Sequence, residues 1–99
     1  MILYAEEALA QIDALRAHFG RKHRIEPIIS LATSLAEAEH RIEAAPAAGL
    51  PAPRPYPQLA RTGRLWIIVR HYWVAYAPTR PPITLAVFHD TADIPGRLP

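Results

Sequence analysis

The residues of this chain that are best suited to chemistry are its histidines and arginines. An imidazole can bind a metal ion or transfer a proton near neutral pH, and a guanidinium can hold a phosphate group. The five histidines are His18, His23, His40, His71 and His89. No two of them lie four residues apart, and the chain has neither an HExxH motif nor a Cys/His cluster. The sequence therefore predicts no metal site.

His89 ends an apolar run and is followed by Asp90. This pattern is typical of a structural histidine that is hydrogen-bonded at the end of a strand. The chain has no GxSxG elbow, no P-loop and no dinucleotide-binding fingerprint. Its carboxylates lie in the predicted helices and at Asp90 and Asp93, so we expect no carboxylate pair in the sheet and no cofactor.

The charges are distributed unevenly along the chain. Residues 1–43 carry seven acidic and five basic residues, whereas residues 44–89 carry five arginines and no acidic residue. These arginines are Arg54, Arg61, Arg64, Arg70 and Arg80. Such a basic segment attracts an acidic partner or a nucleic acid, and charge alone does not distinguish the two.

Three apolar runs rich in β-branched and aromatic residues predict consecutive antiparallel strands, namely Leu65–Val69, Tyr72–Tyr76 and Ile83–His89. Arg70 and His71 form the first predicted turn. The proline-bearing segment 78–82 separates the last two strands, because proline cannot donate to a strand ladder. Leu65–Val69 is apolar at every position, which indicates burial on both faces or a central place in the sheet.

Met1–Tyr4 is short and apolar, and we expect it to be a first strand. Two segments whose apolar residues recur at helical spacing follow it. In the first helix the predicted buried stripe is Leu9, Ile12, Leu15 and Phe19, and Gly20 is placed to end the helix. In the second, which has Pro27 in its first turn and ends before Pro46, the stripe is Ile28, Leu31, Leu35, Ala38, Ile42 and Ala45. The expected fold is α+β, with a two-helix hairpin packed on a small, mainly antiparallel sheet in the order β-α-α-β-β-β.

Two further stripes of small or apolar residues lie away from the predicted buried faces. Ala10, Ala14 and Ala17 either make an ordinary solvent-facing surface or leave a shallow face for another helix. Ile29, Ala32 and Ala36 either pack on the first helix or remain available to a partner.

Residues 45–57 hold five of the eleven prolines and predict an extended strap between the second helix and the sheet. A proline-rich ligand for a small recognition domain is the alternative. We expect residues 1–99 to form one domain. The lack of cysteine suits a reducing cytoplasm, and no apolar run predicts a secretion signal or a membrane span.

The order of these motifs resembles the ParE/RelE superfamily of bacterial toxins. The run 83–95 is similar to its closing strand, which ends in a histidine and an Asp-hydrophobic-Pro sequence, here His89 and Asp93-Ile94-Pro95. Upstream, residues 64–76 resemble its arginine, strand, tight turn and Tyr-x-Val-x-Tyr sequence. Residues 1–8 resemble its opening strand and first helical turn, and residues 45–51 its Pro-x-x-Gly connection. The resemblance covers essentially the whole chain.

The resemblance implies a cytoplasmic toxin of a type II toxin–antitoxin system, held in a hetero-oligomer by a cognate antitoxin that wraps its surface. ParE-like members poison DNA gyrase, and RelE-like members cut messenger RNA on the ribosome. Trp73 and Ala92 stand where ribonuclease members commonly carry basic residues, which would stabilise the charge that develops on a phosphate. We therefore expect a ParE-like inhibitor of DNA gyrase. The alternatives are a RelE-like ribonuclease and a non-toxic remnant that only binds its antitoxin.

Two sets of candidate site residues follow. The basic surface for the target, or for RNA in the ribonuclease alternative, consists of Arg61, Arg64, Arg70 and His89. The antitoxin surface consists of Ala10, Ala14, Ala17, Ile29, Ala32 and Ala36. No metal, cofactor or membrane partner is expected, and the sequence leaves direct nucleic-acid binding open.

Overall fold

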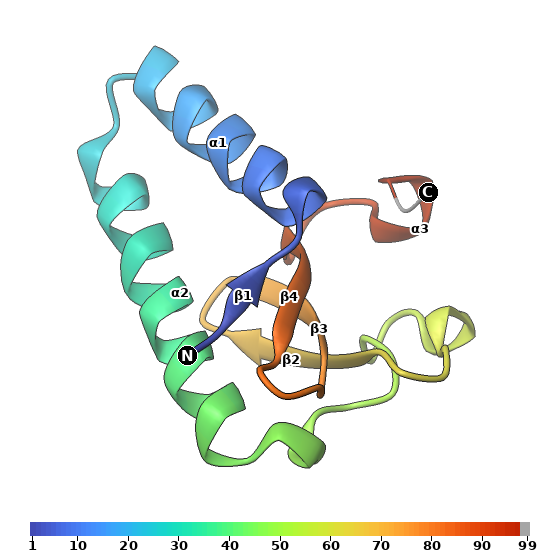
Figure 1. The fold of residues 1–99 in the computed structure, drawn as a ribbon. Coiled ribbons are helices and arrows are strands. Elements are labelled where there is room, and N and C mark those ends of the chain that lie inside the picture. The colour runs from blue at the N-terminus through green and yellow to red at the C-terminus, as the bar shows by residue number, and fades with distance from the viewer. Residues whose placement is uncertain (98–99) are drawn as a thin grey trace.

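The computed structural model describes residues 1–97. Its elements follow the order β1, α1, α2, β2, β3, β4 and α3 (Figure 1). Their bounds are β1 Leu3–Tyr4, α1 Glu6–Arg21, α2 Ile25–Ala44, β2 Leu65–Val69, β3 Tyr72–Ala77, β4 Ile83–His89 and α3 Ile94–Arg97. The predicted α+β class and element order are confirmed.

The sheet is mixed, with the strand order β1-β4-β3-β2. The three long strands pair antiparallel as consecutive neighbours, whereas the two residues of β1 pair parallel with the start of β4. A register shift between Ala75 and Tyr76 places a bulge in the β3–β4 pair. The parallel pair requires a long crossover, and α1 and α2 belong to it.

The helical hairpin covers one face of the sheet. Ile67, Val69 and Val74 pack there against the buried stripe of α2, which contains Leu31, Leu35, Ala38 and Ile42 as expected. In α1 the buried residues are Ala8 and Ile12, with Leu15 and Phe19 half-buried beside them. The expectation for Leu9 is wrong, since it is 49% exposed. Successive residues of a helix are rotated by about 100° around its axis. The buried positions, spaced i, i+4 and i+7, therefore count from Ala8 and not from Leu9. Ala45 is also exposed, because the helix ends at Ala44.

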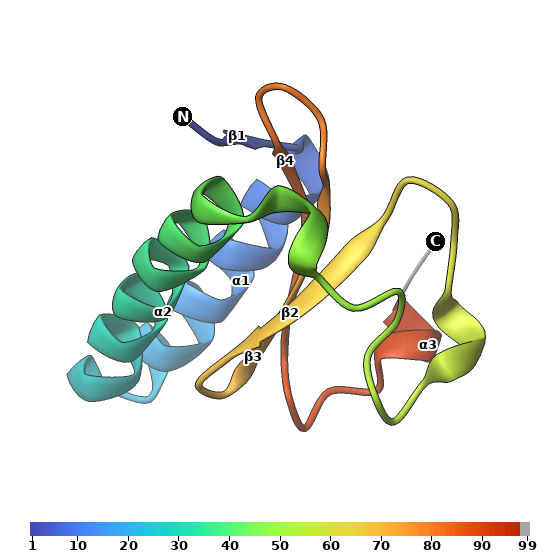
Figure 2. The ribbon, with the colours of Figure 1, turned by 90° about the horizontal axis from the view of Figure 1, so that it is seen from below.

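The strap, which in the structure runs from residue 45 to residue 60, covers the opposite face together with α3. The sheet therefore lies between two layers (Figure 2). Trp66, Trp73 and Phe88 point to this side and pack with Tyr56 and Leu59 of the strap and with Ile94 of α3. The strap contains two short 3₁₀ turns, Pro46–Ala48 and Pro57–Leu59. It connects α2 with the sheet as expected, but these turns show that it is not extended throughout. It also completes a second core.

β2 is buried on both faces, as its apolar sequence predicted, but it is an edge strand rather than a central one. Its outer edge is partly satisfied from elsewhere in the chain. Leu50 of the strap exchanges two backbone hydrogen bonds of 2.7 Å with Trp66, and Arg41 Nη1 of α2 donates to the Ile68 carbonyl at 2.8 Å. The strand can therefore be entirely apolar without a second neighbouring strand. Within residues 1–97, no helix has the length and apolar character needed to cross a bilayer.

Candidate functional site

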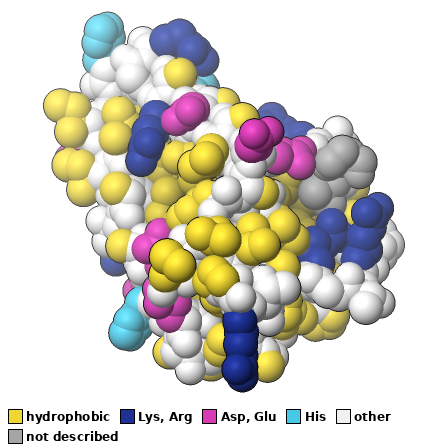
Figure 3. Space-filling view, in the orientation of Figure 1, with side chains coloured by type: hydrophobic (Ala, Val, Ile, Leu, Met, Phe, Trp, Pro, Cys, Tyr) yellow, Lys and Arg dark blue, Asp and Glu magenta, His cyan; other side chains and the backbone are white. Residues whose placement is uncertain are grey.

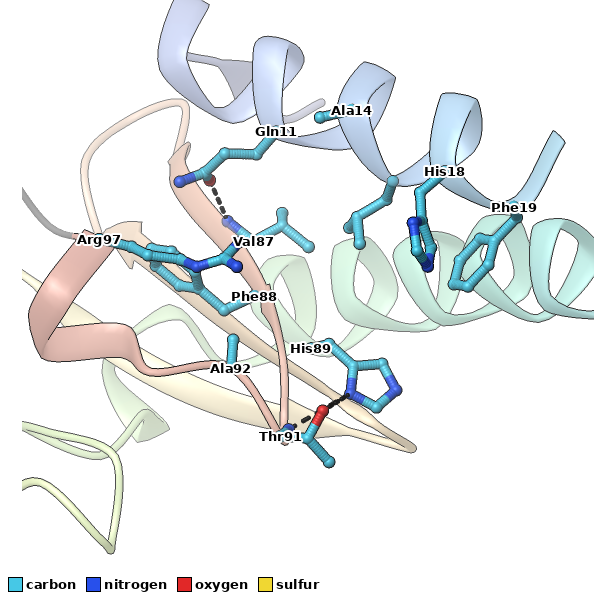
Figure 4. Close-up of a pocket in the computed structure, with 11 residues that line it drawn as sticks. Gln11, Ala14, His18, Phe19, Val87, Phe88, His89, Thr91, Ala92 and Arg97 are labelled. Carbon is cyan, nitrogen blue, oxygen red and sulfur yellow. Dashed lines mark hydrogen bonds between the residues drawn. The ribbon is translucent and has the colours of Figure 1, made fainter. Parts of the chain in front are cut away.

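A groove of about 570 Å³ lies between α1 and the end of β4. We call it the α1–β4 groove. Gln11, Ala14 and His18 of α1 form one wall, and Val87 and His89 of β4 lie across from them (Figure 4). The turn after β4 and Arg97 of α3 close the remaining side. β1 pairs only with the start of β4, and α1 begins directly after β1 ends. The rest of β4 therefore faces α1 across the groove instead of a neighbouring strand.

The His89 side chain contacts four neighbouring side chains at the edge of this groove. Its Nδ1 lies 2.8 Å from Thr91 Oγ1 and 3.2 Å from Asp90 Oδ1. The Tyr72 ring meets the imidazole edge-on, with ring centroids 5.4 Å apart, and the His71 ring stacks on it at 6.2 Å. Asp90 also lies 3.6 Å from His71 Nδ1. His89 is therefore hydrogen-bonded at a strand end, as its sequence context indicated.

A second, shallower hollow of about 330 Å³ adjoins the groove. It shares Phe19 and His89 with the first and adds Arg24, Ser30 and His71. Tyr72 lies at its base, where burial and then the charge of Asp90 raise the pKa of the phenol. The ring of His89 thus stands between two hollows beneath the helical hairpin.

The four residues of the predicted basic surface lie at two different ends of the sheet. Arg61 and Arg64 precede β2, whereas Arg70 follows it and His89 pairs with the neighbouring Tyr72. Six residues of extended chain separate the Cα atoms of Arg64 and Arg70 by roughly 20 Å. The structure therefore brings Arg61 close to Arg64, and Arg70 close to His89, without joining the two pairs.

Arg64 is engaged within the strap layer. Its guanidinium lies 5.3 Å from the centroid of the Trp66 ring and donates to the Leu59 carbonyl. Burial and then the charge of Arg61 lower the pKa of this arginine. Its Nε and the indole nitrogen of Trp66 are buried without a hydrogen-bond partner within residues 1–97. Arg64 thus stabilises the strap and presents only part of its side chain to solvent. Arg61 and Arg70 are exposed.

The predicted antitoxin residues are all exposed, in two stripes on separate helices. Ala10, Ala14 and Ala17 face outward from α1, and Ala14 also lines the α1–β4 groove. On α2 Ala32 and Ala36 are exposed, and Ile29 is 59% exposed. Of the two possibilities for the α2 stripe, packing on the first helix is excluded, and the stripe remains available.

Apolar side chains also gather over β1 and the start of α1, on the face that Figure 3 presents. The exposed large apolar residues of this region are Met1, Leu3 and Leu9. Basic side chains lie at several separate places around this apolar region, and some of them are on the side of the molecule where the strap lies (Figure 3).

The two positions that depart from the ribonuclease pattern differ in their surroundings. Trp73 is only 4% exposed and points into the strap core, away from the helices. Ala92 is half-buried and lines the α1–β4 groove. A basic side chain at 92 would therefore reach the groove, whereas Trp73 contributes packing.

Sequence reasoning did not connect Gln11, His18 and Arg97 with His89. Gln11, Ala14 and His18 repeat at i, i+3 and i+7 beside the buried stripe of α1, which was the available signal. The groove lining contains two histidines and Arg97 but no carboxylate. It can therefore attract an anionic group or move a proton. No group of three or more potential ligand side chains within residues 1–97 could hold a metal ion.

The chain was compared with protein-family models and with curated proteins, and none of either matches it.

Proposed function

We propose that this protein is the toxin of a toxin–antitoxin pair and that it acts by binding a protein target, DNA gyrase, rather than by cutting RNA. The observation that carries this choice is the separation of Arg61 and Arg64 from His89. Arg61 and Arg64 lie at one end of β2 and His89 near the other, and Arg64 is held by the Leu59 carbonyl and the Trp66 ring. A site for in-line cleavage needs its phosphate-holding groups and its proton-transfer group around one phosphate.

The toxin assignment rests on the order of elements and motifs. A short strand, a helical hairpin, a Pro-x-x-Gly connection and three antiparallel strands follow one another as in the ParE/RelE superfamily, which the sequence resembles. The exposed stripes of α1 and α2 offer apolar area for a partner helix, since small side chains allow close approach. DNA gyrase is proposed as the target only because the sequence resembles the ParE-like members of the superfamily.

Gyrase supercoiling tests the target. Purified protein is expected to block supercoiling of relaxed plasmid by gyrase. Normal supercoiling at a large molar excess of folded protein would reject the gyrase proposal. Growth arrest on expression without the antitoxin, relieved by the product of the adjacent gene, tests the toxin assignment separately. Unaffected growth would favour the non-toxic remnant.

The ribonuclease is the second candidate, and one observation favours it. His18 and His89 both line the α1–β4 groove together with Arg97, so that an acid, a base and a cation flank one hollow. Ribosome-dependent cleavage of a reporter transcript that is lost in His89→Gln would establish it and reverse our ranking. Arg64→Ala in the same assay decides whether the distant arginines take part.

The proposed antitoxin surface makes a separate prediction. Ala14→Glu and Ile29→Glu are each expected to weaken binding of the cognate antitoxin at least tenfold, because each places a charge on an apolar contact. Both positions are exposed, so circular dichroism should show an unchanged fold. Thr62→Glu, exposed beside the strap, is the matched control. Unchanged titrations of both helix variants would leave these stripes as ordinary solvent-facing surface.

A further inference from the structure

One edge of β4 is open along most of its length. β1 pairs only with Ile83 and Thr84, and the Ala5 amide makes the last contact, to the Thr84 carbonyl at 2.9 Å. The chain then turns into α1 at Glu6. The remaining residues of β4, 85–89, have β3 on one side and the α1–β4 groove on the other. This leaves roughly 16 Å of strand edge without a neighbouring strand.

The register determines which backbone groups face this edge. In an antiparallel pair, directly opposed residues alternate between hydrogen-bonded and non-hydrogen-bonded pairs. The Asp90 amide donates to the His71 carbonyl at 2.8 Å, which makes Tyr72 and His89 a non-hydrogen-bonded pair. By the same alternation Val87 is opposite Val74 in a non-hydrogen-bonded pair. The amides and carbonyls of Val87 and His89 therefore point into the groove.

Two of these four groups form hydrogen bonds with other parts of the chain. Gln11 Oε1 accepts a hydrogen bond of 2.7 Å from the Val87 amide, and the Ala92 amide donates to the His89 carbonyl at 3.0 Å. Within residues 1–97, the Val87 carbonyl accepts no hydrogen bond and the His89 amide donates none outside the strand ladder. A glutamine carboxamide has the same hydrogen-bonding groups as a peptide bond. Gln11 therefore occupies one position of a missing strand.

We infer that the α1–β4 groove binds an extended acidic peptide segment of a partner protein, which adds to β4 as a strand. Main-chain pairing suits the two open groups of Val87 and His89 and would replace the contact from Gln11. The small side chain of Ala14 leaves room above the edge. His18, His89 and Arg97 line the groove without a carboxylate, and the adjacent Asp90 already faces His71 and His89. Charge complementarity therefore selects an acidic segment. The inference is independent of the toxin proposal.

Fluorescence anisotropy with a short labelled peptide of alternating glutamate and valine tests this binding. The wild-type protein is expected to bind it saturably. A version with N-methylated backbone amides should lose at least tenfold in affinity, because it cannot pair with a strand edge. A version with lysine in place of glutamate should also bind more weakly. Equal binding of the N-methylated and unmodified peptides would overturn strand addition and reduce the groove to an electrostatic site.

Matched variants locate the site. Gln11→Ala removes the hydrogen bond with the Val87 amide that competes with the peptide. This variant is expected to bind the peptide about fivefold more tightly, which corresponds to the net contribution of one hydrogen bond. Gln58→Ala, exposed in the strap, is the control and should change nothing. Ala14→Trp fills the groove and should abolish binding, whereas Ala17→Trp, exposed on the same helix outside the groove lining, should not.

Amide resonances report the pairing directly. On addition of the alternating peptide, the ¹⁵N–¹H signals of Val87 and His89 should shift most strongly within the sheet, and the His89 amide should become protected from hydrogen exchange. Shifts confined to Arg61 and Arg64, or displacement of the peptide by an oligonucleotide with no change at His89, would overturn the inference.

Discussion

At the scale of single residues, the close approach of the strap to the sheet limits which side chains fit at Gly49 and Tyr76. Tyr76 donates a hydrogen bond of 2.6 Å to the Pro46 carbonyl, and Gly49 lies directly beside it. A Cβ atom at Gly49 would lie 2.5 Å from Tyr76 Oη and 2.8 Å from Leu65 Cβ. The backbone of Gly49 has an ordinary extended conformation, so space rather than conformation requires glycine. This gives a physical reason for the Pro-x-x-Gly sequence.

Gly49→Ala is therefore expected to lower the free energy of unfolding by about 1–3 kcal/mol through overpacking. Gly20→Ala is the matched control. Gly20 lies near the end of α1 with no atom within 4 Å of an added Cβ, so alanine there should raise stability by up to about 1 kcal/mol. Urea denaturation of both variants at neutral pH measures the difference. Equal stability of Gly49→Ala and the wild type would show that the strap can move aside.

Among the elements, the short helix α3 depends on a single side chain. Ile94 is 0% exposed and packs on the strap face of the sheet with Trp66 and Phe88. A helix of four residues is not stable by itself, so burial of this residue positions it. Asp93-Ile94-Pro95 thus acts as an anchor that brings Arg97 to the α1–β4 groove.

Ile94→Ala should cost about 2–5 kcal/mol, because it leaves a cavity between α3 and the sheet. Ile29→Ala, at a position that is 59% exposed, should change the free energy of unfolding by less than about 0.5 kcal/mol. Thermal unfolding monitored by tryptophan fluorescence compares the two. A small effect at Ile94 would mean that α3 does not need this contact to stay in place.

At the scale of the whole molecule, tyrosines connect its layers. Tyr4 of β1 donates to Glu39 of α2, and burial and then this hydrogen bond raise its pKa. Burial also raises the pKa of Tyr72 and of Tyr76. In the unfolded chain these phenols lose their protons near their ordinary pKa of 10.0, while the folded protein still holds them.

The stability from these tyrosines is therefore fully present below pH 10 and is lost as the pH rises through the raised values. We expect the free energy of unfolding to fall steadily above about pH 10. The Tyr4→Phe variant should show a smaller fall, since one titrating group is removed. Denaturant titrations at neutral and alkaline pH measure both slopes. Identical slopes for the variant and the wild type would contradict the assignment to Tyr4.

The sequence by itself determined the elements, because their signals are local. Leu31, Leu35, Ala38 and Ile42 recur at helical spacing, and β2 carries five apolar residues in a row, so the helices and strands could be assigned from patterns within single elements. The starting register of α1 was not determined in this way. Ala8 and Leu9 are both apolar, and only the direction of the sheet decides which is buried.

The candidate site was decided by the tertiary structure. The hydrogen bond between Gln11 and Val87 joins residues 76 positions apart, and no pattern within α1 or β4 reports that the two meet. The basic segment reads as one surface in the sequence, but a strand is extended, so β2 carries Arg64 and Arg70 to opposite ends of the sheet. The groove, its open strand edge and the separation of the arginines all arise from how the elements cross, which periodicity within one element cannot specify.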